Sequence, residues 1–311
     1  MARTKKPVPK PRRRFGLWIG LALAAAIIGF LVWMHLCARI VHVRYAEVHL
    51  DDLPASFDGT TLLYVSDVDV CGLNKPWQAA RTIQRLQALE PDVLLLGGDY
   101  ASADLLDRLN GHTSAEESAA RGSFFAGLAG FNAPLGKLAI SGDGDGDASQ
   151  LALQMSASGV QLIDGGAQIL DNGTDSLAIV GLGSQPADVT AIASQFSSAD
   201  CVLVLAHSPD QLIGVQIAEA ADGGAWADLV LAGHTHGGQV RLFGRTALSL
   251  TEMEERYLAG WYDGDTLPVL VTQGLGCEGA NFRLGTQAEV WFITLRTGSS
   301  TSGESEGASS R

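Results

Sequence analysis

Five short apolar segments of this 311-residue chain end in side chains that bind metal ions or move protons. Those side chains are four carboxylates followed by three imidazoles, namely Asp67, Asp69, Asp99, Asp143, His207, His234 and His236. Carboxylate and imidazole groups together are typical ligands of Mn²⁺, Fe²⁺ and Zn²⁺. Because open α/β sheets place functional groups beyond the carboxyl ends of their strands, we expect these seven side chains to lie near one another.

One motif among them is more specific than the rest, Gly-His-Thr-His-Gly at residues 233–237. A single histidine after an apolar segment is usually a core residue, and a single aspartate there is usually a helix-cap or turn residue. Two histidines separated by one residue, however, can both reach one metal ion, or bind one ion each of an adjacent pair. The motif therefore favours metal binding.

A second motif, GDGDGD at residues 142–147, raises the alternative of a calcium loop. An EF-hand loop that began at Asp143 would need glycine at its sixth position and glutamate at its twelfth. Those positions hold Ala148 and Gln154, so the EF-hand pattern is not met. A surface protein that binds structural Ca²⁺ is a weaker hypothesis for the whole chain, because Ca²⁺ prefers oxygen ligands to imidazoles.

Taken in order, these motifs resemble those of the calcineurin-like metallophosphoesterases, whose pattern is DxH, GD, GNH[DE], H and GHxH. The resemblance covers about residues 44–296 and includes AHSPD at 206–210, GHTHGGQV at 233–240 and QGLGCEG at 273–279. It looks most like the membrane-anchored bacterial branch. The resemblance implies an α/β fold in which two mixed β-sheets pack as a sandwich flanked by helices. It also implies hydrolysis of a phosphate ester or pyrophosphate.

A centre of two divalent metal ions follows from the same resemblance. Its implied ligands are Asp67 and His236 at the first ion, His207 and His234 at the second, and Asp99 as the bridge between them. Asp143 stands where the family has its metal-binding asparagine, and the carboxylate of Asp69 can also bind metal. Two cations about 3.5–4 Å apart hold a phosphoryl oxygen, activate water and stabilise the attacking and leaving oxygens. Mn, Fe or Zn suits such ligands best, with Mg or Ca as alternatives.

Two residues depart from the family's pattern. Asp69 stands where the family has the histidine of DxH, and Gly144 stands where it has the catalytic histidine of GNH[DE]. A general acid contributes about 10²–10⁴-fold to a rate, so its loss would slow the hydrolysis of esters with poor leaving groups. We expect Asp145 to be the substitute catalytic group, with Asp147 as the alternative. A catalytically weak relative that binds metal or a phosphorylated ligand is the competing interpretation.

Buried strands must position these groups, and the apolar segments have the composition of such strands. They are residues 61–65, 93–96, 138–140, 177–180, 202–206, 229–232, 269–271 and 290–295. The spacing of apolar residues predicts helices between several of them, at residues 76–89, 115–128, 149–158, 188–196 and 209–221. This alternation indicates an α/β domain over residues 44–296.

The N-terminal region predicts a membrane anchor. Residues 1–14 are a basic head, and residues 15–37 form an apolar segment long enough to cross about 30 Å of hydrocarbon as a helix. A cleaved signal peptide would have a shorter apolar region of about 7–15 residues and a small-residue cleavage site. The positive charge before the span predicts a single-pass protein of the cell membrane, with a cytoplasmic N-terminus and an extracytoplasmic domain.

The charge distribution limits the partners. The net charge is −13, and the seven basic residues within 1–14 leave 14 basic and 34 acidic side chains for the rest of the chain. A body this acidic repels nucleic acid, so we expect no nucleic-acid partner. The expected substrate is a phosphorylated small molecule or lipid. The Ser/Gly-rich residues 297–311 predict a disordered tail.

Overall fold

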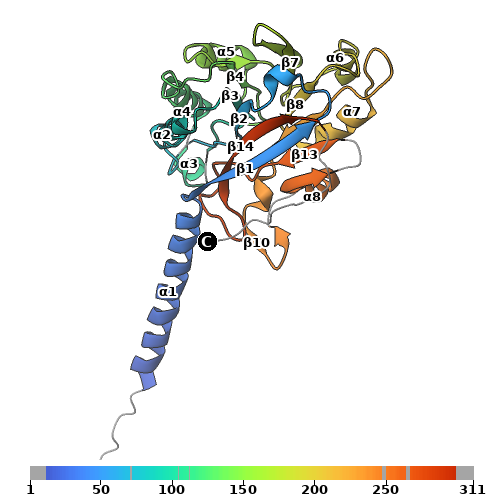
Figure 1. Ribbon diagram of the computed structural model, residues 1–311. Coiled ribbons are helices and arrows are strands. Elements are labelled where there is room, and N and C mark those ends of the chain that lie inside the picture. Colours follow the sequence, from blue (N-terminus) through green and yellow to red (C-terminus); the bar gives the residue numbers. More distant parts are fainter. Residues whose placement is uncertain are drawn as a thin grey trace, which may run out of the picture.

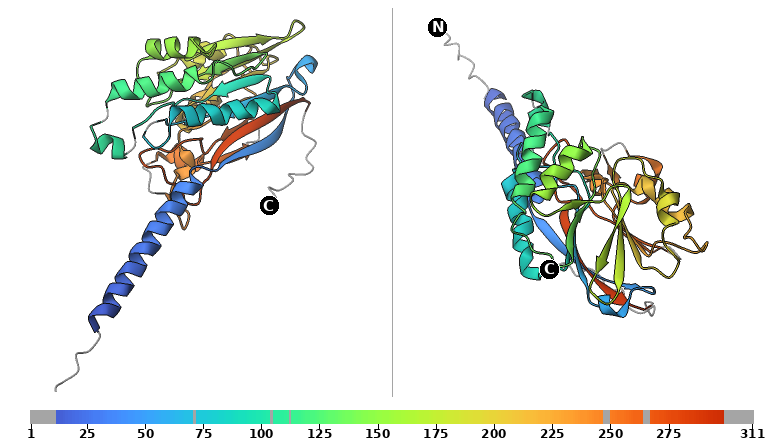
Figure 2. Two further views of the ribbon diagram at one scale, coloured as in Figure 1. Left: turned by 90° about the vertical axis from the view of Figure 1, so that its left-hand side faces the viewer. Right: turned by 90° about the horizontal axis from the view of Figure 1, so that it is seen from above.

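A computed structural model describes residues 12–70, 72–103, 105–111, 113–246, 250–263 and 267–298. Two six-stranded sheets form the body, and helices lie on their outer faces (Figures 1 and 2). The predicted fold class, a sandwich of two mixed sheets with flanking helices, is confirmed.

The first sheet contains six strands, of which the four in the order β2-β3-β4-β5 are parallel. In spatial order it consists of β1 (Val41–Leu50), β14 (Ala288–Thr297), β2 (Thr61–Val65), β3 (Val93–Leu96), β4 (Gly136–Ala139) and β5 (Gln161–Leu162). β14 runs antiparallel to β2 and parallel to β1. The last long strand of the chain is therefore inserted between the first two.

The second sheet has a parallel centre and antiparallel edges. In spatial order it consists of β12 (Gly260–Asp263), β13 (Pro268–Val271), β9 (Leu229–Ala232), β8 (Val202–Ala206), β7 (Ser176–Leu182) and β6 (Gly166–Asp171). The edge strands β6 and β12 are antiparallel to their neighbours. A separate short hairpin joins β10 (Arg241–Leu242) to β11 (Arg245–Thr246).

The helices divide between the two sheets. The first sheet is covered by residues of α2 (Pro76–Arg85), α4 (Ser114–Ala126) and α5 (Ala148–Ser156), and the second by those of α6 (Val189–Ala193) and α7 (Leu212–Ile217). The described part also contains α3 (Leu105–Leu109), α8 (Glu252–Arg256) and the 3₁₀ turns η1 (Ala55–Phe57), η2 (Leu86–Leu89), η3 (Pro209–Gln211) and η4 (His236–Gly238).

Alternation along the strands builds three apolar layers. In β2, Leu62 and Tyr64 lie in the core between the sheets, whereas Leu63 and Val65 lie in the layer that α2 and α4 complete. Both sets are fully buried, which explains why such strands read as continuous apolar segments. All eight strands predicted from the sequence are present, within two residues of the predicted bounds.

The predicted domain bounds can be compared with the sheet. β1 begins at Val41, before the expected start at residue 44, and β14 extends to Thr297, the first residue of the expected tail. Residues 1–11 of the basic head and residues 299–311 of the tail lie outside the described residues.

A long helix, α1 (Arg12–Cys37), extends away from the body (Figure 1). Its segment Phe15–Cys37 has a mean hydropathy of 2.4 and is, in the part of the chain that is described, the one helix long and apolar enough to cross a membrane. Among the described residues, the contacts between α1 and the body come from its last turn. The carbonyl of Met34 accepts a hydrogen bond from the backbone N–H of Arg283 (3.1 Å), and Nδ1 of His35 donates to the carbonyl of Asn281 (2.9 Å).

Candidate metal centre

The seven predicted ligand residues lie just beyond the carboxyl ends of strands from both sheets. The first sheet supplies the four aspartates, after β2, β3 and β4, and the second sheet supplies the three histidines, after β8 and β9. Carboxylates and imidazoles thus come from opposite layers of the sandwich.

His207 links the two sets of side chains. Its Nε2 lies 3.4 Å from Oδ2 of Asp99, and its ring centroid lies 5.0 Å from that of His234. One ligand atom from each of Asp99, His207 and His234 lies within 4.8 Å of the other two. These three side chains are close enough together to bind one metal ion.

A second group adjoins the first. Nε2 of His236 lies 3.6 Å from Oδ2 of Asp69. The backbone N–H of Asp69 donates to the carbonyl of Asp99 (3.0 Å), and the backbone N–H of His234 donates to Oδ1 of Asp67 (2.9 Å). Asp99 therefore adjoins both groups, through its carboxylate to His207 and through its backbone carbonyl to Asp69.

Asp143 lies at the rim of the cluster. Its Oδ2 is 3.8 Å from Nδ1 of His234, and its side chain is 62% exposed. The structure therefore brings all seven predicted residues into one cluster, with Asp143 as its most exposed member.

Four buried polar atoms of the cluster have no hydrogen-bond partner among the described residues. They are Oδ2 of Asp67, Oδ2 of Asp69, Nδ1 of His234 and Nδ1 of His236. Each buried polar atom without a partner costs about 1–3 kcal/mol. Four of them in one place indicate a missing partner, and a divalent cation is one that both carboxylate oxygens and imidazole nitrogens bind. The residues present therefore fit metal ions.

Other atoms of the same side chains are held by the protein. Oδ1 of Asp99 accepts a hydrogen bond from the backbone N–H of Gly144 (2.8 Å). Nδ1 of His207 donates to the carbonyl of Gly97 (3.0 Å), which directs Nε2 toward the cluster. Such contacts orient metal ligands and select the tautomer of an imidazole.

The backbone of the cluster is strained. Among the described residues, five of the candidate ligands have a positive φ, which non-glycine residues rarely adopt: Asp67 (52°), Asp69 (46°), Asp99 (51°), His234 (70°) and His236 (49°). Each such residue costs of order 1–3 kcal/mol. Strain concentrated in one cluster is typical of functional sites, because the rest of the fold must hold it in place.

Close approach of the strand-end loops requires glycine. Gly98 has a φ of +96°, and a Cβ there would lie 2.6 Å from the backbone nitrogen of Gly142 and 2.8 Å from Nδ1 of His207. Any side chain at Gly98 would separate Asp99 from His207. The Gly-Asp motif is therefore explained by packing as well as by chemistry.

Burial and mutual repulsion set the charges of the cluster. Burial raises the pKa of Asp67 to about 6, although His207 opposes that shift. Burial, together with Asp99 and Asp67, raises the pKa of Asp69 well above its usual value. Burial lowers the pKa of His207, but the carboxylate of Asp99 outweighs it and raises the pKa to about 10. Without bound cations, the cluster therefore has too little positive charge to balance its buried carboxylates.

Asp145, the predicted catalytic group, is fully buried behind the cluster. Its Oδ2 accepts the backbone N–H groups of Asp99 (2.9 Å) and Gly142 (2.8 Å), and its Oδ1 accepts that of Tyr100 (2.9 Å). Burial raises its pKa to about 7, and these donated bonds oppose that shift. A protonated carboxyl would need an acceptor, whereas the backbone groups around Asp145 are donors. The geometry therefore fits a positioning residue that holds Asp99 rather than a proton donor.

Gly144 itself offers space for a side chain. A Cβ there would lie 3.3 Å from Oδ1 of Asp99 and 3.5 Å from the carbonyl of Ala101. Its contact with the cluster is the backbone N–H that Asp99 accepts. The second alternative, Asp147, caps α5 by accepting the backbone N–H of Gln150 (2.9 Å).

Three further residues support the candidate ligands, and of these the sequence did not indicate Glu254 or Ser102. Glu254 lies 3.0 Å from Nε2 of His234, through its Oε1. Ser102 donates to Oδ1 of Asp69 (2.7 Å). Arg283 is fully buried, and its guanidinium donates to the carbonyl of His236 (3.2 Å) and to three carbonyls of residues 273–276.

Curated proteins similar to this chain are named metallophosphoesterases. The chain is 24% identical over 271 residues to the uncharacterized metallophosphoesterase YkuE of Bacillus subtilis, a match that covers 82% of this chain and 89% of the relative. It is 26% identical over 125 residues to the uncharacterized metallophosphoesterase Cj0846 of Campylobacter jejuni, a match that covers 40% of this chain and 30% of that protein. No family model matches the chain.

Solved structures give more distant similarities. A calcineurin-like phosphoesterase, YfkN of Bacillus subtilis, has a TM-score of 0.35 and 12% identity over 76% of this chain and 91% of its own. A dimetal phosphatase of Danio rerio has a TM-score of 0.39 and 11% identity over 70% of this chain and 88% of its own. By its motifs and its curated relatives, this chain resembles the metallophosphoesterases over most of its length.

Proposed function

We propose that this protein is a membrane-anchored hydrolase that cleaves a phosphate ester or pyrophosphate through a centre of two divalent metal ions. The observation that carries the proposal is the convergence of all seven candidate ligands from two sheets. The four buried side-chain oxygen and nitrogen atoms among them that have no hydrogen-bond partner support it further.

Each candidate ligand has a proposed part. Asp67, Asp69 and His236 would hold the first ion, Asp143, His207 and His234 would hold the second, and Asp99 would be shared by the two. When bound, such ions supply Lewis-acid activation of water and of the phosphoryl group. The chain's own residues fix the geometry: Gly144 and Gly97 orient Asp99 and His207, so that little reorganisation is needed at the moment of reaction.

The number of carboxylates influences the choice of metal and the strength of catalysis. Asp67, Asp69, Asp99 and Asp143 carry four negative charges when ionised, which two divalent ions neutralise. A neutral centre holds its cations tightly but attracts an anionic phosphate less strongly. The imidazoles favour Mn, Fe or Zn, and the additional carboxylate at Asp69 extends the range toward Mg or Ca.

The location and substrate follow from α1. Its apolar segment Phe15–Cys37 is long enough to cross a bilayer, and we propose that it anchors the body on the extracytoplasmic side. The substrate is then a phosphorylated small molecule or lipid on that side, and the acidic body makes nucleic acid an unsuitable partner.

An assay of the full-length protein in detergent tests the proposal. Metal is removed with a chelator, Mn²⁺, Zn²⁺, Mg²⁺ or Ca²⁺ is added back, and hydrolysis of p-nitrophenyl phosphate and bis-p-nitrophenyl phosphate is followed. We expect a transition metal to restore turnover and Asp99→Ala to abolish it, while Asp175→Ala, a change on the exposed turn after β6, leaves it unchanged. Turnover that survives in Asp99→Ala would contradict the two-metal proposal.

Gly144 motivates a second candidate function, a catalytically weak protein that binds metal or a phosphorylated ligand. The space around its Cβ allows Gly144→His to be built with a small adjustment. If the missing general acid belongs at this position, Gly144→His should increase the turnover of alkyl phosphates by about 10²-fold or more. Gly144→Ala is the control, because it adds the Cβ without the imidazole. Two bound metal ions with no turnover in any variant would favour the binding function.

A further inference from the structure

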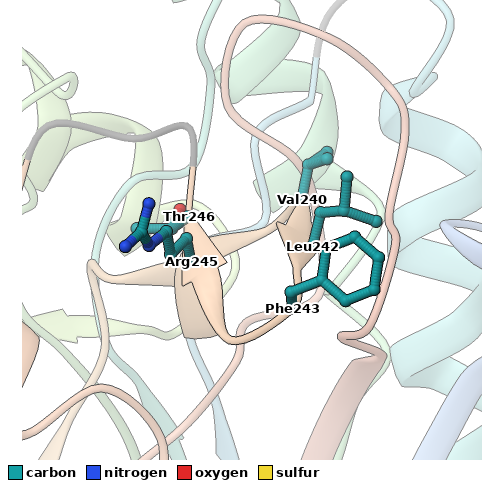
Figure 3. A pocket seen from close by; sticks show the side chains of 5 residues that line it. All are labelled: Val240, Leu242, Phe243, Arg245 and Thr246. Carbon is teal, nitrogen blue, oxygen red and sulfur yellow. The ribbon is translucent and has the colours of Figure 1, made fainter.

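The tip of the β10–β11 hairpin exposes two large apolar side chains next to each other. Leu242 is 59% exposed and Phe243 is 95% exposed. Figure 3 shows both side chains on the same side of the hairpin as Val240, with Arg245 on the other side. Phe243 also has a positive φ of 52°, an unusual conformation for an aromatic residue. A strained turn that presents phenylalanine to water indicates a surface with a partner.

The hairpin and α1 are held by the same short segment. The backbone N–H of Arg241 donates to the carbonyl of Leu284 (2.7 Å), and Val240 forms a β-bridge with Leu284. The neighbouring residue, Arg283, donates its backbone N–H to the carbonyl of Met34 in α1 (3.1 Å). The hairpin therefore has a defined position relative to α1, and Figures 1 and 2 show it on the side of the body from which α1 extends.

A second apolar segment lies at the exit of α1. Arg39, two residues after the helix, donates to the carbonyl of Leu73 and to Oε1 of Gln78 (3.0 Å). In this segment Trp77 is 60% exposed and Leu73 is 45% exposed. A tryptophan here matches the preference of indole rings for the headgroup region of a bilayer.

Positive charge accompanies these apolar groups although the body is acidic. Lys75 lies between Leu73 and Trp77, and Arg241 and Arg245 flank the hairpin tip; Lys75 and Arg245 are exposed. Basic residues beside exposed aromatic and aliphatic side chains are the composition of a surface that binds anionic phospholipids.

We propose that Leu73, Trp77, Leu242 and Phe243 enter the headgroup region of the leaflet that α1 crosses, with Lys75 and Arg245 on the lipid phosphates. The partner is thus an anionic phospholipid bilayer, and the inference rests on the proposed anchoring by α1. Three contacts, from α1, the 73–77 segment and the hairpin, would fix the orientation of the body. Because the guanidinium of Arg283 holds the carbonyl of His236, the metal centre would keep a constant orientation to the bilayer.

Fluorescence quenching by brominated lipids tests the hairpin contact. The full-length protein is reconstituted into vesicles of phosphatidylcholine and phosphatidylglycerol, with and without bromine on the acyl chains. Tryptophan is introduced by Phe243→Trp or, as the matched control, by Leu153→Trp. Leu153 is 73% exposed and lies on α5, at the end of the body away from α1 (Figures 1 and 2).

We expect the tryptophan added by Phe243→Trp to be quenched at least twofold more than the one added by Leu153→Trp. Arg245→Gln in the Phe243→Trp variant should reduce that difference, because it removes a charge that binds the anionic lipid. If the tryptophans introduced at positions 243 and 153 are quenched equally, the proposed contact between the hairpin and the bilayer is overturned.

The wild type separates this outcome from failure of the anchor or of catalysis. Trp18 and Trp33 lie in α1, so brominated lipid quenches the wild type if α1 is inserted. Absence of that quenching contradicts the anchor and the hairpin contact together. Loss of ester hydrolysis with the quenching difference intact contradicts the hydrolase alone.

Discussion

Oε1 of Glu254 lies 3.0 Å from Nε2 of His234, and this contact directs the other ring nitrogen, Nδ1, into the candidate metal centre. That Nδ1 is buried, has no hydrogen-bond partner among the described residues and lies 3.8 Å from Oδ2 of Asp143. Glu254 is itself fixed, because its Oε2 accepts the backbone N–H of Thr251 (2.8 Å) in the capping box of α8. A carboxylate behind a metal-binding imidazole orients the ring and increases its basicity.

We therefore expect Glu254→Gln to weaken metal binding by about 10–100-fold, the usual effect of losing such a carboxylate. The metal concentration that gives half-maximal activity should rise by that factor, while activity at saturating metal falls less. Glu255→Gln, at an exposed position of the same helix, is the matched control. An unchanged metal requirement in Glu254→Gln would show that the contact with His234 is incidental.

Asp69→Asn should have opposite effects on the metal-free and metal-loaded protein. Asp69 is buried, and Asp99 and Asp67 raise its pKa, so its charge destabilises the fold when no cation is present. With metal, the same carboxylate is a proposed ligand, and a free metal concentration of 100 times the Kd adds about 2.7 kcal/mol of stability. Melting temperatures in chelator and in excess Mn²⁺ give the comparison. We expect the variant to melt higher than wild type in chelator and lower in Mn²⁺; the same sign in both would contradict Asp69 as a ligand.

Asp145→Asn distinguishes a positioning residue from a general acid. The carboxylate accepts three backbone N–H groups, and an amide would turn its own NH₂ toward at least one of them. We expect a loss of about 2–4 kcal/mol in stability. The pH dependence of kcat should keep its shape, because a positioning residue transfers no proton in the reaction. A variant of normal stability whose alkaline limb disappears would instead make Asp145 the catalytic acid.

Asp228 gives a prediction for pH that is independent of the metal centre. Burial, with Asp52 and Asp51 nearby, raises its pKa to about 6, and its Oδ2 accepts the backbone N–H of Val202 (2.7 Å). Since the folded state holds the proton more tightly than the unfolded state, the stability from Asp228 is complete below about pH 4 and is lost as the pH rises through 6.

Asp228→Asn keeps an acceptor for Val202 and removes the charge. We expect it to gain about 1 kcal/mol over wild type at pH 7, a value reduced from the full linkage effect because Asp228 is half-buried. The gain should disappear near pH 4. Chemical denaturation at both pH values measures it, and a gain that is equal at the two pH values would contradict the assigned pKa.

The sequence predicts the central strands and the ligand cluster for the same physical reason. β2, β3, β8 and β9 are buried on both faces, so they are continuous apolar segments, and the polar residues that end them are conspicuous. In β6, by contrast, buried and exposed positions are mixed, and β5, β10 and β11 have two residues each. Such strands form because neighbours supply hydrogen bonds, which the local sequence does not reveal.

Supporting residues of the centre are less predictable than ligands. Glu254 appears in the sequence only as part of a helix-start pattern, Thr251-x-x-Glu254. Its contact with His234 depends on how α8 packs against the loop after β9. Similarly, Asp145 stands next to the site in the sequence, yet its side chain turns back into the loop to accept backbone N–H groups. Only the three-dimensional arrangement separates these two roles.

The insertion of β14 between β1 and β2 has a consequence for biosynthesis. All four aspartates belong to the sheet that β14 completes, and β14 ends at Thr297. A chain emerging from the ribosome therefore contains the four aspartates before the three histidines are made, and its first sheet lacks an inner strand until β14 has been synthesised. We therefore expect the proposed metal centre to form only after β14 has joined the first sheet.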